Sequence, residues 1–86
     1  MNYLSLKTFS QALQLTNKGD IENAKKHLLK ALSINPNYAD AHNNLGALLF
    51  REKDYTEAKK HYLQAISVNP NGSGARESLS RSENLY

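Results

Sequence analysis

Apolar side chains recur at helical spacing along most of this sequence. Two stretches each place five apolar residues on one side of a helix, namely Ile21, Ala24, Leu28, Ala31 and Leu32 in the first, and Tyr55, Ala58, Tyr62, Ala65 and Ile66 in the second. Residues three, four and seven positions apart share one face of an α-helix, so each set predicts an amphipathic helix with a buried face. Leu45, Gly46 and Leu49 precede the second set, and the small residues Gly46 and Ala58 would let two helix backbones approach closely.

Turn residues divide this pattern into separate helices. Asp20 and Asp54 are predicted N-caps, and Asp54 with Glu57 has the spacing of a capping box, in which the aspartate accepts a backbone N–H and the glutamate reaches back. Pro36 and Pro70 mark helix exits, because proline lacks a backbone donor and disfavours helix at the residue before it. The predicted helices cover residues 3–17, 21–33, 38–51, 55–67 and 74–84.

The sequence also repeats itself at a fixed interval. The tetrapeptide Ala-Lys-Lys-His at residues 24–27 recurs at 58–61, and Ser-Ile-Asn-Pro-Asn at 33–37 recurs as Ser-Val-Asn-Pro-Asn at 67–71. The two prolines give the period, 70 − 36 = 34 residues. A repeated helix pair predicts a solenoid, because each pair has an apolar flank that only a stacked neighbour can cover.

The second unit has a characteristic set of motif positions. They are His42, Leu45, Gly46, Leu49, Ala58, Tyr62, Ala65 and Pro70. This pattern resembles the tetratricopeptide repeat, a helix pair with the same period. The first unit matches it more loosely, through Ala12, Leu15, Ala24, Leu28, Ala31 and Pro36. It departs from the family at Thr8 and Gln11, where large apolar residues are usual.

The resemblance implies an all-α fold, a right-handed α-α superhelix (a TPR-like solenoid) of two antiparallel helix pairs plus a capping helix. We expect a single domain over residues 1–86, with repeat one at about 5–38, repeat two at about 39–72 and the capping helix at about 73–86. The last segment is rich in Ser, Arg and Glu, as expected for a helix that covers the edge of the preceding pair. Arrays usually need three or more repeats, so self-association and excision from a longer protein both stay open.

In solenoids of this family the first helix of each pair lines a concave groove that holds a peptide segment or a helix of a partner. The first-helix residues not needed for the pair core are expected to face it, namely Leu6, Phe9, Ser10, Leu13, Asn17, Asp40, Asn43, Asn44, Ala47, Phe50 and Arg51. The Asn44 amide could bond a ligand backbone or merely its own neighbours. Phe9, Leu13 and Phe50 could anchor apolar ligand groups or belong to ordinary packing. Arg51 could pair with a carboxylate.

Some relatives in that family clamp a terminal carboxylate with lysine and asparagine on successive first helices. Here Phe9 and Leu13 replace those residues in the first unit, and Gly74 and Ser78 stand where the third would need basic side chains. Chaperone-tail binding is therefore disfavoured.

The amino-acid composition further limits the classes of function and the location to be expected. The chain has no cysteine, which excludes thiolate chemistry and suits a reducing compartment, so we expect a cytoplasmic protein. It has no apolar run of the roughly 18 residues that a membrane span needs. The net charge is +3, and Lys25, Lys26, Lys59 and Lys60 repeat along the second helices. No aromatic residues alternate with these lysines, so a solvated helix surface is favoured over a nucleic-acid site.

The three histidines do not predict a metal site. His27 and His61 occupy equivalent positions in successive units, so we expect them about one helix-pair width apart, too far to share a metal with bonds of about 2 Å. His42 is better explained as a partly buried, hydrogen-bonded residue. No nucleophile, base and acid form a recognisable set, and no glycine-rich phosphate loop occurs. We expect neither enzymatic activity nor a cofactor or metal.

The sequence thus favours a protein–protein interaction module or scaffold that binds an unidentified protein or peptide. A self-associating repeat unit, for example a homodimer, is the alternative, and a weakly basic module that associates with nucleic acid is a less favoured third.

Overall fold

The computed structural model describes residues 3–72 and 74–83. This part of the chain forms α1 (Tyr3–Asn17), α2 (Ile21–Ile34), α3 (Ala39–Arg51), α4 (Tyr55–Val68) and α5 (Ala75–Glu83) and contains no strand. The predicted all-α class is confirmed, and each helix end lies within one residue of its predicted position where the structure describes it. The predicted end at residue 84, and residues 73 and 84–86 of the capping segment, lie outside the described residues.

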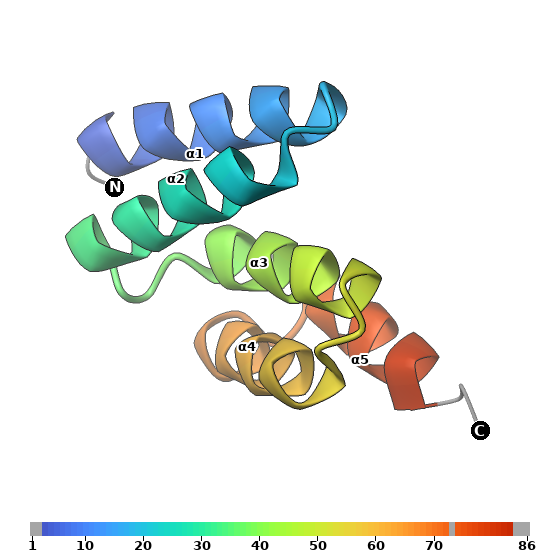
Figure 1. Ribbon diagram of the computed structural model, residues 1–86. Helices are drawn as coiled ribbons and strands as arrows, with labels where there is room; N and C mark the ends of the chain where they lie inside the picture. The colour runs from blue at the N-terminus through green and yellow to red at the C-terminus, as the bar shows by residue number, and fades with distance from the viewer. Residues whose placement is uncertain (1–2, 73, 84–86) are drawn as a thin grey trace.

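The helices stack in chain order as antiparallel pairs (Figure 1). α1 packs along α2, and α3 packs along α4, while α2 also contacts α3 and joins the two pairs. α5 lies against α4 and α3. The molecule is therefore elongated, with extents of 38 × 27 × 17 Å, and α1 and α5 form its two ends.

Both pairs use the same tight turn between their helices. Gly19 has a φ of +83°, and Lys53, the residue 34 positions later, adopts a φ of 67°. The left-handed region is natural for glycine but uncommon for lysine. Asp20 and Asp54 then cap α2 and α4, and each carboxylate accepts the backbone N–H three residues on at 3.4 Å. The predicted caps are confirmed.

The second half of the predicted capping box does not fit the structure. The backbone N–H of Asp54 donates to the carbonyl of Leu49 at 2.9 Å, closing the turn onto the end of α3. The N–H of Asp20 makes the equivalent bond to Leu15 at 2.9 Å. Because the turn itself uses this donor, Glu57 is not needed as its partner.

The core consists of two clusters that share α3. The first joins α1, α2 and α3 and contains Phe9, Ala12, Ala24, Leu28, Ala31, Leu32, Tyr38, Ala41, Leu45 and Leu48. The second joins α3, α4 and α5 and contains Ala39, Ala58, Tyr62, Ala65 and Ala75. Each helix pair thus buries one flank against its neighbour, as the repeat predicts.

Tyr55 is the exception among the predicted core residues. It is 37% exposed, and its ring packs edge-on against that of Phe50, with the ring centroids 5.2 Å apart. As the first residue of α4, it lies at the end of the helix interface, where solvent reaches one side. Helical periodicity correctly predicted on which face of α4 Tyr55 lies, but not how far its side chain is buried.

α3 and α4 approach each other closely at Gly46. A Cβ atom added to Gly46 would lie 2.7 Å from the ring of Tyr62 and 3.2 Å from the carbonyl oxygen of Ala58. Ala58 is fully buried beneath it. The close backbone contact predicted from Gly46 and Ala58 is therefore confirmed.

Candidate functional site

The first helices of successive pairs, α1, α3 and α5, run roughly in the same direction (Figure 1). α3 is the central one, and the residues predicted to line the groove extend along it from Asp40 in its first turn to Arg51 in its last. At 1.5 Å per residue these two positions are about 16 Å apart along the helix axis. One end of this row is acidic and the other basic.

A cavity of about 190 Å³ lies at the basic end, between α3 and α5. Its lining residues are Ala47, Phe50 and Arg51 from α3, Tyr62 from α4, and Ser78 and Arg81 from α5. The structure thus brings together three of the predicted groove residues and adds three that the sequence analysis did not include. The repeat contained a signal for two of them, because Arg81 aligns with Ala47, and Ser78 with Asn44, at the 34-residue offset.

The walls of this cavity combine apolar surface with uncharged and cationic donors. Tyr62 is 3% exposed, and burial raises the pKa of its phenol more than the hydrogen bond with Ser78 and the charge of Arg81 lower it. The hydroxyl therefore stays protonated at neutral pH. Arg51 and Arg81 are exposed, and neither forms a salt bridge with another described residue.

At the other end of α3, the two asparagines are partly engaged in the fold. The Asn44 side-chain amide donates to the carbonyl of Asp40 at 2.7 Å, one turn earlier in the same helix. A methyl group at Gly74 would lie 3.9 Å from the amide nitrogen of Asn43, so Asn43 lies beside the start of α5. Asp40 lines a different hollow, together with Val68 and Asn69. One of the two predicted alternatives for Asn44, bonding to its neighbours, is thus observed.

The first unit does not continue the groove in the predicted way. Phe9 was expected to face outward, but it is 9% exposed and packs on Tyr38, with ring centroids 4.8 Å apart. The neighbouring residue, Thr8, is small and buried, and its hydroxyl donates to the Leu4 carbonyl at 2.8 Å. Phe9 and Tyr38 therefore fill the space between α1 and the start of α3. The other α1 residues named for the groove, Leu6, Ser10, Leu13 and Asn17, are exposed.

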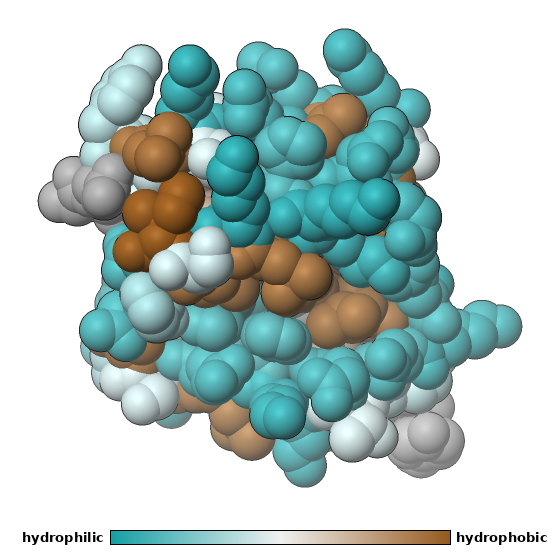
Figure 2. Space-filling view, turned by 60° about the vertical axis from the view of Figure 1, so that its left-hand side comes forward, coloured by the Kyte–Doolittle hydropathy of each residue, from teal (hydrophilic) through white to brown (hydrophobic). Residues whose placement is uncertain are grey.

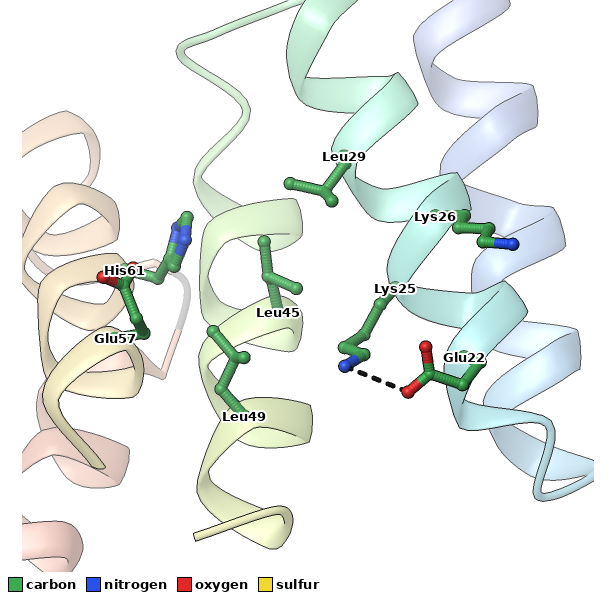
Figure 3. A pocket seen from close by; sticks show the side chains of 8 residues that line it. All are labelled: Glu22, Lys25, Lys26, Leu29, Leu45, Leu49, Glu57 and His61. Atoms are coloured by element: carbon green, nitrogen blue, oxygen red, sulfur yellow. Dashed lines mark ion pairs between the residues drawn. The ribbon is translucent and has the colours of Figure 1, made fainter. Parts of the chain in front are cut away.

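A second hollow, of about 310 Å³, lies over α3 between α2 and α4 (Figure 3). Leu29, Leu45 and Leu49 form its apolar floor, and charged side chains surround it. Figure 2 shows apolar side chains gathered in a band across one face of the molecule, bordered by polar ones. The sequence analysis assigned no site to this face.

Lys25 closes one side of that hollow with two ion pairs. Its ammonium lies 3.2 Å from Glu22 on α2 and 2.6 Å from Glu52 at the end of α3. The hydrogen bond to Glu52 is the largest reason why the pKa of Lys25 is raised. Lys25 was predicted to be part of a solvated basic surface, but these two glutamates neutralise its charge. Its ion pair with Glu52 also connects the first helix pair to the second.

Two of the three histidines meet between α3 and α4. His42 is 7% exposed, and its Nε2 lies 2.8 Å from the Pro36 carbonyl, as expected for a buried, hydrogen-bonded histidine. Its Nδ1 lies 3.1 Å from Nδ1 of His61, a contact that the sequence analysis did not predict. His27 bonds the Asn23 carbonyl within its own helix at 2.9 Å. Within the described ranges, no three side chains of the metal-binding types come together.

Comparison with known protein families agrees with this architecture. A family model described as tetratricopeptide repeat matches residues 39–71, and a second, described as TPR repeat, matches residues 12–53. The two matches overlap and together extend over well more than half of the chain. Comparison with curated proteins gives no match at a significant level. Of the helices in the described part of the chain, none combines the length and apolar character required to cross a membrane.

Proposed function

We propose, for a chain that belongs to the tetratricopeptide repeat family, that its function is to bind a peptide segment of a partner protein along α3 and α5. Domains of this family generally mediate protein–protein interactions and are typically non-catalytic. The observation that carries the proposal is the cavity beside Phe50, where the first helices of the second and third units provide an apolar wall and two arginines without a salt bridge to any described residue. A cytoplasmic location is part of the proposal, since a chain without cysteine suits a reducing compartment.

The dimensions of the cavity favour a peptide side chain over a free small molecule. Pockets for drug-sized ligands usually measure about 300–1,000 Å³ and enclose most of the ligand. This cavity is smaller, about 190 Å³, and it opens onto the row of α3 residues that leads to Asp40. A segment laid along α3 could place one apolar side chain against Phe50 and Ala47 while its backbone meets polar side chains further along.

Binding to selected peptides tests this proposal. The protein is immobilised and used to select ligands from a random peptide library, and the affinity of the selected peptides is measured by fluorescence anisotropy. Phe50→Ala should weaken binding by about tenfold, because the apolar wall is lost. Leu63→Ala is the matched control, because Leu63 is a 47% exposed residue of α4 that does not line the cavity.

Thermal unfolding of each variant separates lost binding from lost structure, since Phe50 also packs against the second core cluster. Phe50→Leu, which keeps most of the packing, serves as a second variant. Selected peptides that lose affinity with Leu29→Ala but not with either Phe50 variant would place the site in the α2–α4 hollow and contradict the proposal. Selection of no peptide would contradict it as well.

Self-association is the second candidate, and the surface of α1 favours it. Tyr3, Leu6 and Leu13 share one face at helical spacing, and they are 75%, 46% and 37% exposed. A second copy could cover this face in the way that α3 covers the first pair. Light scattering over a dilution series tests this candidate. A dimer that dissociates on dilution, and is lost in Leu6→Glu, would support it, whereas a monomer at all concentrations would exclude it.

A further inference from the structure

We infer that the cavity between α3 and α5 selects an acidic peptide segment, with a carboxylate held by Arg51 and Arg81 and a neighbouring apolar side chain against Phe50. This inference rests on the proposed function and specifies the class of peptide that the site takes.

The two arginines are available for an anionic ligand. Arg51 and Arg81 line the same cavity from different helices, and neither forms an ion pair within the described chain. Glu52, the acid next to Arg51 in the sequence, instead bonds Lys25 on α2 at 2.6 Å. Guanidinium groups bind carboxylates through parallel N–H donors, so two of them at one opening form a strong carboxylate site.

An ordinary structural role explains only part of this arrangement. Each arginine lies in the last turn of its helix, where a cation compensates the negative end of the helix dipole. That role needs one arginine on each helix but does not require both to line a common cavity. Among the described residues, no acidic side chain lines the cavity, so none of them balances the two positive charges there.

The rest of the cavity determines what accompanies the carboxylate. Phe50 and Ala47 offer apolar surface, and the hydroxyl of Tyr62 interacts with Ser78. Nucleic acid would need a run of cations spaced along its phosphates, whereas here two arginines flank an apolar hollow. Asp40 at the far end of α3 disfavours a second acid there, so the acidic part of the ligand should lie toward Arg51.

Three synthetic peptides that differ only in the two residues beside a central leucine test the inference. The first has a central Glu-Leu-Glu in a Gly/Ser background, the second has Gln-Leu-Gln and the third has Lys-Leu-Lys, and binding to each is measured by fluorescence anisotropy. The acidic peptide should bind about tenfold tighter than the glutamine peptide, as expected for charge-assisted hydrogen bonds, and this preference should shrink in high salt. The lysine peptide should bind most weakly.

Variants assign the preference to the two arginines. Arg51→Gln and Arg81→Gln should each remove most of the preference for the acidic peptide while leaving the glutamine peptide nearly unchanged. Arg76→Gln is the matched control, because it removes the same charge from α5 at a residue that bonds Asn71 and lies outside the cavity. Equal effects of Arg76→Gln and Arg81→Gln would overturn the inference.

The outcomes also separate this inference from the proposed function. If the acidic and glutamine peptides bind equally and both depend on Phe50, the groove binds peptides and the acidic preference is wrong. If no peptide binds, the proposed function fails and the inference fails with it. A duplex DNA probe that binds in an Arg51- and Arg81-dependent manner and displaces the acidic peptide would overturn the inference in favour of phosphate recognition.

Discussion

His42 and His61 join α3 to α4 through a direct contact between their rings. Their Nδ1 atoms lie 3.1 Å apart, the ring centroids 5.4 Å apart, and the ring planes are inclined by 28°. Because Nε2 of His42 lies against the Pro36 carbonyl at 2.8 Å, it must be the donor there. In the neutral tautomer with the proton on Nε2, Nδ1 of His42 is the acceptor and Nδ1–H of His61 is the donor.

This histidine pair predicts that stability falls in mildly acidic solution. Burial, and next the repulsion that a protonated His42 would exert, lower the pKa of His61 below its ordinary value of 6.5. The unfolded chain therefore binds more protons than the folded one, so the contribution of His61 is fully present above about pH 6.5 and is lost as the pH falls through the lowered pKa. We expect the free energy of unfolding, measured with urea, to decrease between about pH 7 and pH 5.

Two substitutions check that the histidine pair is the cause. His61→Gln should flatten the pH dependence, whereas His27→Gln should leave it as in the parent, because His27 bonds the carbonyl of Asn23 within its own helix and is not part of the pair between α3 and α4. Parallel curves for His61→Gln and the parent would show that other groups are responsible.

Gly46→Ala should destabilise the protein, although alanine is the better helix former by about 1 kcal/mol. Its methyl group would lie 2.7 Å from the Tyr62 ring, and that ring is only 3% exposed and has little room to move. Overpacking of this kind costs about 1–3 kcal/mol, so we expect a net loss of about 1 kcal/mol in chemical denaturation. Gly46→Ala combined with Tyr62→Leu should recover part of it. A gain in stability from Gly46→Ala alone would mean that the two helices separate without cost.

Ala58→Leu tests the same interface from the other side. Ala58 is fully buried, and its carbonyl oxygen lies near the Cα of Gly46. The extra methylene groups should push α3 and α4 apart and cost about 1–3 kcal/mol. The control is Gln64→Leu, which places the same side chain at an exposed position of α4. A melting temperature for Ala58→Leu equal to that of the control would contradict the close packing.

The two helix caps should contribute to stability by similar amounts. Asp20→Ala and Asp54→Ala each remove an acceptor for a first-turn N–H, and each should cost about 1 kcal/mol in urea denaturation. Asp20 also accepts a bond from the side-chain amide of Asn23 at 2.9 Å. The asparagine variants at both positions keep the capping acceptor and should retain most of the stability. No difference between the alanine and asparagine variants would remove the capping role.

Features that depend on local sequence were predictable. The ends of the helices follow from Asp20, Asp54 and the two prolines, because caps and turns are made by residues close together in the chain. The 34-residue repeat also predicted that the helix pairs stack, and Gly46 with Ala58 predicted a close contact between two helices. Phe50, Arg51 and Ala47 were also correctly placed together, since residues three and four apart share one side of a helix.

Contacts between different helices were decided by the tertiary structure. The burial of Phe9 against Tyr38, the meeting of His42 with His61, and the entry of Arg81 into the cavity beside Arg51 each depend on how one helix is rotated and shifted against another. Helical periodicity tells which residues share a face, but the rotation between helices is chosen by side-chain packing over the whole interface. The sequence by itself therefore determined the helices and their stacking order, and only the packed structure decided which side chains meet.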